Sequence, residues 1–131
     1  MEMEIFFPGG KEVDARIDDL TVITDQPIDE GGTNKAPSPF TLFLASIGTC
    51  TGYYVLSFCQ KHKIPTKNMK LIVKIERNFE THMVENIHID IQVPKDFPEQ
   101  YKNAVMKAAE ACAVKRHLEK PPKITMGVSK H

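Results

Sequence analysis

The sequence predicts an α+β fold in which antiparallel sheets wrap a long central helix, with the element order β-β-β-α-β-β-α-β. Residues 40–59 contain no charged side chain, which indicates a mostly buried helix. Two later runs, at 70–78 and 84–93, alternate apolar and polar residues, as paired strands with one buried face do. The 131 residues fit one domain, 1–131, with a single core.

Short strand-like runs occupy the N-terminal region at 4–7, 13–17 and 20–24, separated by turn residues. They predict a small antiparallel meander. Residues 26–37 are rich in glycine and proline, so an irregular connection should lead into the long helix. Connections of this kind often carry functional residues.

The long helix has a start signal and a stop signal. Ser38 can cap it, and Pro39 suits the first helical position because its missing N–H would be unpaired there anyway. We expect the helix to run to about Lys63, before Pro65. Twenty uncharged residues could also span a bilayer. The serine, threonine and tyrosine residues among them favour a helix buried on nearly all sides in a soluble core, with no membrane partner.

The C-terminal third predicts a second helix and a last strand. Asp96 and Glu99 have capping-box spacing at the start of the helix. Its apolar stripe consists of Phe97, Tyr101, Val105, Ala108 and Cys112. The Pro121-Pro122 pair should end the helix, and alternation over 124–128 predicts a final strand.

Composition excludes several classes of function. Seventeen basic and 17 acidic side chains cancel, so no net field would hold a nucleic acid. Three cysteines without an even framework, and no leader-like N-terminal run, indicate a cytoplasmic location. His62 and His117 follow cysteines at short spacing, but no paired-ligand motif accompanies them, so no metal site is expected.

Cys50 and Cys112 are the best candidates for chemistry. At about 100° per residue, Cys50 and Cys59 point to opposite sides of the long helix, so they cannot form a disulfide within it. Cys59 is expected to be a buried structural residue. Gly48 and Gly52 flank Cys50, and each lowers helix propensity by about 1 kcal/mol relative to alanine. Two explanations fit these glycines. They allow tight packing against another helix or strand, or they allow a substrate or the helix that carries Cys112 to approach Cys50 closely.

Three segments resemble the OsmC/Ohr family, and its OsmC-like branch most closely. They are Gly31-Gly32-Thr33-Asn34-Lys35-Ala36-Pro37-Ser38-Pro39, Ala45-Ser46-Ile47-Gly48 before Cys50, and Ala111-Cys112-Ala113-Val114. The similarity covers nearly the whole chain. It implies an intertwined homodimer in which the two central helices pack together and two active sites lie at the subunit interface. It also implies thiol-dependent reduction of organic hydroperoxides, without a metal or bound cofactor.

The implied chemistry fits the two thiols. A Cys50 thiolate would attack the outer peroxide oxygen and become a sulfenic acid, which Cys112 would then resolve as a disulfide. An external dithiol, which the resemblance implies to be lipoyl-type or another small dithiol, would reduce that disulfide. The expected substrate-pocket residues are Phe40, Phe43, Tyr53 and Tyr54, although the same side chains would serve equally as core.

The sequence departs from the family at the groups that activate the thiolate. In the family, an arginine from the N-terminal strands activates it, and a glutamate just after the helix-entry proline orients the arginine. Here Phe40 and Thr41 stand where the glutamate is expected. Arg16 is the only arginine before the helix, so it is the candidate activator. The weaker alternatives are Arg77 and Arg116 as the cation, and Asp29 or Glu30 as the carboxylate in a different geometry.

A second departure is Ala113, which stands where a proline commonly follows the resolving cysteine. Its presence would allow the second helix to continue through Cys112. Three interpretations remain open: a thiol peroxidase, a non-catalytic protein that binds a small apolar ligand or senses redox state, and two cysteines that are only core. Both cysteines favour the enzyme, whereas the missing glutamate favours the binding protein.

Overall fold

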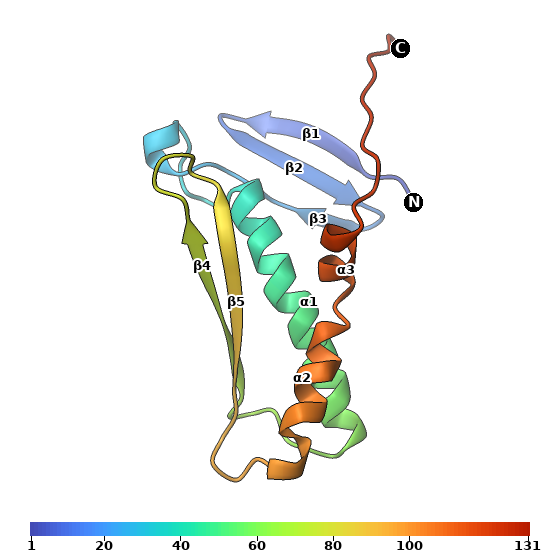
Figure 1. The fold of residues 1–131 in the computed structure, drawn as a ribbon. Coiled ribbons are helices and arrows are strands. Elements are labelled where there is room, and N and C mark those ends of the chain that lie inside the picture. The colour runs from blue at the N-terminus through green and yellow to red at the C-terminus, as the bar shows by residue number, and fades with distance from the viewer. The chain divides into compact units, whose positions relative to one another are not determined.

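A computed structural model describes all residues 1–131 and confirms the mixed α+β class with antiparallel sheets (Figure 1). Two compact units are present, residues 1–46 and 47–131, and each is described by itself. The first unit contains a meander and the connection into the long helix. The second contains a hairpin and the shorter helices. The long helix begins in the first unit and ends in the second.

The meander of the first unit is a three-stranded antiparallel sheet in the order β1-β2-β3, as predicted (Figure 1). The strands are β1 (Glu4–Gly9), β2 (Glu12–Ile17) and β3 (Leu20–Val22). Gly10 turns the chain between β1 and β2 with φ of 57°, a left-handed conformation that glycine adopts without steric cost. Cross-strand neighbours include the Glu4 and Arg16 pair.

The irregular connection that follows contains one short 3₁₀ turn, η1 (Ile28–Glu30). The buried carboxylate of Asp25 holds it together by accepting hydrogen bonds from three residues. A Cβ on Gly32 would lie 1.9 Å from the carbonyl oxygen of Gln26, so only glycine fits there. The connection therefore enters the long helix from a defined direction within its unit.

The long helix is α1 (Pro39–Lys61), and its predicted start is confirmed. Ser38 Oγ accepts a hydrogen bond from the Thr41 N–H at 3.3 Å, as an N-cap residue does. By length and composition alone, α1 could cross a membrane, and 28% of its apolar window is buried. The expected burial on nearly all sides is wrong for the single chain, since Tyr53 is 62% exposed and Leu56 38%. The chain covers one stripe of α1 and leaves another open.

The second unit contains an antiparallel hairpin of β4 (Lys70–Arg77) and β5 (Val84–Gln92), as predicted. Apolar residues face one another across it in the pairs Leu71 with Ile91, Val73 with Ile89 and Ile75 with Ile87. Cross-strand apolar pairs of this kind stabilise a sheet and fix its register.

The predicted second helix is interrupted. It comprises the 3₁₀ turn η2 (Glu99–Tyr101), α2 (Lys102–Glu110) and α3 (Ala113–Glu119). The predicted capping box is wrong, because Pro98 is the N-cap of η2 and the residue before a proline disfavours the helical conformation. Continuation of the helix through Cys112 is also wrong, because Cys112 has an extended ψ of 124° and separates α2 from α3.

The last strand predicted at 124–128 does not form. Residues 121–131 have no regular structure and make no backbone hydrogen bonds to the β4-β5 hairpin of their unit. Met126 and Val128 are almost fully exposed. Alternation identifies a segment that suits a strand, but a strand also needs a pairing edge, which this segment does not meet within the single chain.

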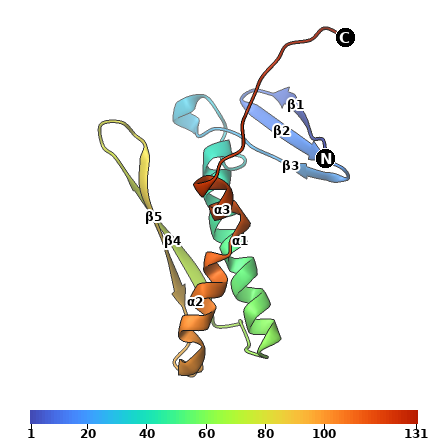
Figure 2. The ribbon, with the colours of Figure 1, turned by 45° about the vertical axis from the view of Figure 1, so that its right-hand side comes forward.

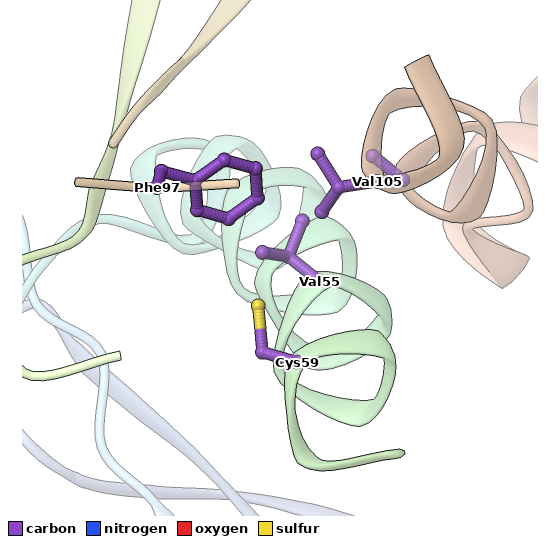
Figure 3. Packing of buried hydrophobic residues seen from close by; sticks show 5 residues of the cluster. Val55, Cys59, Phe97 and Val105 are labelled. Carbon is purple, nitrogen blue, oxygen red and sulfur yellow. The ribbon is translucent and has the colours of Figure 1, made fainter. Parts of the chain in front are cut away.

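The core of the second unit lies between α1 and α2 (Figure 3). It is built from Val55 and Cys59 of α1, Phe97, and Val105 and Ala109 of α2. Figures 1 and 2 both show α2 alongside the C-terminal half of α1. Cys59 is 0% exposed in this cluster, in agreement with the structural role predicted for it.

Candidate thiol site

The second unit brings Cys50 and Cys112 together. Cys50 lies on α1 and is partly exposed, whereas Cys112 is 0% exposed and is the N-cap residue of α3. Both thiols are free, and the two side chains are in hydrogen-bond contact. The interruption between α2 and α3 places Cys112 so that it meets α1 with its side chain rather than continuing a helix.

The surroundings of Cys112 favour its ionised form. Burial alone would raise the pKa of its thiol, but the backbone N–H of Lys115 and the Cys50 side chain outweigh that effect. The Thr51 side chain and the Val114 N–H act in the same direction, and the pKa of Cys112 is lowered.

Thr51 follows Cys50 in the sequence, and its side chain is in hydrogen-bond contact with Cys112. It is 5% exposed, and its hydroxyl donates a hydrogen bond to the Ile47 carbonyl at 2.8 Å. Thr51 was not predicted as a site residue from the sequence, although a signal existed. Ile47, Thr51, Val55 and Cys59 recur every four residues on the buried stripe of α1, and Thr51 is the one hydroxyl among them.

An apolar cavity of about 400 Å³ lies beside Thr51. Its apolar lining comes from α1, β5, α2 and α3 and includes Ile47, Ile87, Ile89, Ile91, Met106 and Leu118. Three ionisable side chains also line it, namely His88, Glu110 and Lys115. Apolar walls with a few polar groups are typical of sites that bind small organic molecules.

The predicted pocket residues lie elsewhere on α1. Phe40 stacks on Phe43 with ring centroids 5.7 Å apart, and Tyr53 contacts Tyr54 edge to face at 5.4 Å. None of the four lines the cavity beside Thr51, while Phe43 lines a separate cavity of about 440 Å³ in the first unit. Their contact with a substrate stays a prediction.

Arg16 is held by its own sheet. Its guanidinium forms an ion pair with Glu4 at 2.7 Å and lies 4.6 Å from the centre of the Phe6 ring. Arg16 belongs to the first unit and Cys50 to the second. Glu4 was not predicted as the carboxylate partner of Arg16, since cross-strand register decides that pairing. The activating role of Arg16 stays a prediction.

The other charged candidates are placed as follows. Arg77 contacts the His82 carbonyl in the hairpin at 3.4 Å, and Arg116 lies exposed on α3. Asp29 and Glu30 are exposed in η1. No three His, Cys, Asp or Glu side chains gather in a geometry that could hold a metal ion.

The two glycines beside Cys50 differ. A Cβ on Gly48 would lie 2.8 Å from Cγ2 of Val73, so tight packing on β4 explains this residue. A Cβ on Gly52 would meet no atom within 4 Å. Gly52 therefore leaves room on the open side of α1.

Fold and site together define an α+β protein with two contacting thiols and an apolar cavity that is lined by Thr51, the residue after Cys50, but by neither cysteine. A family model described as OsmC-like protein matches residues 32–127, and the chain belongs to this family. The resemblance drawn from the sequence is thereby confirmed. No curated protein matches the chain.

Solved structures share the fold. A Psychrobacter arcticus protein, described as a candidate osmotic stress induced and detoxification response protein, aligns with TM-score 0.73 and 20% identity, over 87% of this chain and 85% of its own. An OsmC-like protein from Mycoplasma pneumoniae aligns with TM-score 0.70 and 13% identity, over 92% and 87%. An organic hydroperoxide resistance protein from Elizabethkingia anophelis aligns with TM-score 0.59 and 19% identity, over 92% and 90%. These identities establish the fold alone.

Proposed function

We propose that the protein is a thiol-dependent peroxidase that reduces organic hydroperoxides, with Cys50 as the nucleophile and Cys112 as the resolving thiol. The observation that carries the proposal is the contact between their side chains. Cys50 is partly exposed and can meet a peroxide, whereas Cys112 is buried and in contact with it. A sulfenic acid at Cys50 would thus have its resolving thiol in contact before over-oxidation could occur.

The apolar cavity supports an organic substrate. Its isoleucine-rich lining favours the hydrocarbon part of an organic hydroperoxide over hydrogen peroxide, which has no apolar surface to bury. Family membership and the similarity to organic hydroperoxide resistance proteins support the same class of substrate.

The reaction needs an external reductant. Once the Cys50–Cys112 disulfide has formed, a small dithiol of the lipoyl type would attack it and leave as its own cyclic disulfide. The proposal places this cycle in the cytoplasm, where such reductants keep thiols reduced. Peroxide turnover measured with dihydrolipoamide and with glutathione tests which reductant the protein uses. We expect faster turnover with dihydrolipoamide, the dithiol.

We also propose a homodimer that buries the open side of α1. This side carries Tyr53 and Leu56, and Gly52 on the same side would allow a second helix to approach closely. Leu56→Glu should dissociate the dimer in sedimentation velocity, whereas Gln100→Glu, at an exposed polar position of η2 away from α1, should not. A monomeric wild-type protein at micromolar concentration would refute this assembly.

The peroxidase is tested by mixing reduced protein with cumene hydroperoxide and following each thiol by mass spectrometry. Wild type should form the Cys50–Cys112 disulfide, and Cys112→Ser should accumulate a dimedone-reactive sulfenic acid on Cys50. Cys59→Ser is the matched control, because Cys59 is buried in the apolar core and should leave both outcomes unchanged. Oxidation of Cys50 no faster than that of free cysteine would reject the enzyme.

A second function is favoured by one observation: positions 40 and 41, where the family carries its glutamate, hold Phe40 and Thr41. A non-catalytic relative would use the apolar cavity to bind a small ligand. Binding of a fluorescent fatty acid by Cys50→Ser, together with no peroxide turnover by wild type, would select this function.

A further inference from the structure

We propose that the apolar cavity of the first unit binds a small primary amine, whose ammonium group is held by the buried carboxyl group of Asp14 and whose hydrocarbon part contacts the apolar walls. The cavity is lined entirely by residues of the first unit, and the proposed peroxidase makes no use of it. The proposal therefore goes beyond that function and can be tested separately from it.

The cavity has the size and the walls of a site for a small organic molecule. It measures about 440 Å³ and lies between the meander and the first turns of α1. Pockets of a few hundred Å³ with apolar walls commonly bind such molecules. The hydrocarbon walls include Ile5, Val13, Val22, Leu42 and Phe43, and the polar lining residues are Asp14, Thr24 and Ser46. These three polar residues therefore decide which polar group a ligand must carry.

Asp14 is buried without the donors that surround the other buried acid of this unit. Asp14 is 4% exposed and Asp25 is 3% exposed, so burial does not distinguish them. Asp25 accepts four hydrogen bonds, which fill the capacity of a carboxylate. Asp14 accepts one backbone hydrogen bond, from the Thr24 N–H at 3.3 Å. The Asp14 carboxyl group therefore retains the capacity to accept hydrogen bonds from a ligand.

The charges near Asp14 favour a cation as its partner. Burial, and then the neighbouring acid Glu12, raise the pKa of Asp14. The Lys35 ammonium forms its ion pair with Glu12, at 2.7 Å, and has only a minor effect on Asp14. One basic group thus serves two acids, and no basic side chain lines the cavity. A cationic ligand would supply the missing opposite charge.

The two hydroxyl groups of the lining use their protons within the protein. The Thr24 hydroxyl donates to the Val13 carbonyl, and the Ser46 hydroxyl donates to the Phe43 carbonyl at 2.6 Å. Neither hydroxyl therefore offers a donor to the cavity. A carboxylate or phosphate ligand would bring acceptors and meet no donor, whereas an ammonium group brings three donors and no acceptor. The polar part of the lining is thus complementary to an ammonium group.

A primary amine suits Asp14 in either protonation state of the acid. An ammonium ion binds directly to the carboxylate, whereas a neutral amine takes the proton of the carboxylic acid. Both routes end in the same ammonium–carboxylate pair, with the same number of protons. Charge-assisted hydrogen bonds of this kind are roughly twice as strong as neutral ones. An amine should therefore bind more tightly than an alcohol of the same shape.

Isothermal titration calorimetry of the full chain with 2-phenylethylamine and with 2-phenylethanol at pH 7.5 tests the site. The two probes share their hydrocarbon part and differ in the polar group. Wild type should bind the amine about tenfold more tightly than the alcohol. Asp14→Asn should lower the affinity for the amine about tenfold and leave that for the alcohol within about twofold. Asp19→Asn is the matched control, because it removes the same charge at an exposed turn and should keep the preference.

Nuclear magnetic resonance tests the site without any variant, which matters if Asp14→Asn does not fold. Addition of 2-phenylethylamine to the wild-type protein should shift the backbone amide signals of Ala15, Val22 and Leu42, which line the cavity. The amide signals of the β4-β5 hairpin, which contributes no residue to this cavity, should stay unchanged. Shifts confined to the hairpin or to the second unit would place the amine elsewhere and refute the site.

Three calorimetric results would overturn the proposal: equal affinities for amine and alcohol, amine binding that Asp14→Asn leaves unchanged, or no saturation by the amine below about 10 mM. A second copy of the chain as the occupant would give another result. The amine would then bind only at concentrations where sedimentation velocity shows monomer, and Asp14→Asn would shift the monomer–dimer equilibrium, which would also refute the amine site. None of these measurements involves a peroxide, so failure of the proposed peroxidase would leave the outcome unchanged.

Discussion

The carboxylate of Asp25 accepts the Thr33 hydroxyl at 2.7 Å and, through the same side chain, the backbone N–H groups of Gln26 at 2.8 Å and Lys35 at 3.1 Å. One buried acid thereby fixes both ends of the connection into α1. These hydrogen bonds, with that from Thr33 the strongest influence, hold the pKa of Asp25 at about 2.

Asp25→Asn should destabilise the protein at neutral pH, because the amide cannot accept all of these bonds. The folded-state pKa of about 2 lies below the ordinary value of 3.8, so the stabilisation is complete well above pH 3.8 and is lost as pH falls through about 2. Urea unfolding at several pH values should show the gap between wild type and Asp25→Asn closing over that range. Asp29→Asn, at an exposed position of η1, is the control. A gap that stays constant down to pH 2 would contradict the prediction.

Gly48→Ala should destabilise the second unit by about 1 kcal/mol. The new Cβ would lie 2.8 Å from Val73 Cγ2, and such overpacking costs about 1 to 3 kcal/mol against a gain of about 1 kcal/mol in helix propensity. Val73 is stiff at χ1, so it cannot easily move aside. Denaturant unfolding of Gly48→Ala, Val73→Ala and the double variant should show that removal of Cγ2 relieves the clash. Strict additivity of the two changes would disprove the contact.

The sequence pattern predicted the elements that depend on residues close to one another in the chain. The hairpin is the clearest case, because alternation fixed the face on which Val73 and Ile89 meet. The Ser38 cap likewise depends on residues only three positions apart. Such elements depend on neighbours in the sequence, so the sequence is sufficient to find them.

The interruption at Cys112 had no local signal. Ala111 and Ala113 are both good helix formers, and no glycine or proline marks the break, so propensity predicted a continuous helix. The contact with Cys50 and the N–H groups that face Cys112 are consequences of that break. The two site cysteines were predictable as a pair, whereas the surroundings that lower the pKa of Cys112 depend on tertiary structure.

Phe97→Ala should cost about 3 to 5 kcal/mol of unfolding free energy, the usual loss for a fully buried phenylalanine. Phe97 is 5% exposed and packs on Val55 and Val105, so its removal leaves a cavity between α1 and α2 (Figure 3). Phe79→Ala is the matched control, because Phe79 is 97% exposed and its loss should change stability by less than about 0.5 kcal/mol. Equal losses in the two variants would contradict the proposed core.

Arg16→Met tests whether Arg16 activates the Cys50 thiol. Its ion pair with Glu4 is solvent-exposed, so the variant should lose less than about 1 kcal/mol of stability. Because Glu4 and the Phe6 ring hold the guanidinium within its own sheet, we expect the rate of Cys50 oxidation by cumene hydroperoxide to stay within about threefold of wild type, far from the 100-fold or greater loss that removal of an electrostatic catalytic group causes. Glu4→Gln is the control, since it breaks the same ion pair and keeps the arginine. A loss of about 100-fold in Arg16→Met, with Glu4→Gln unaffected, would instead assign the activation of Cys50 to Arg16.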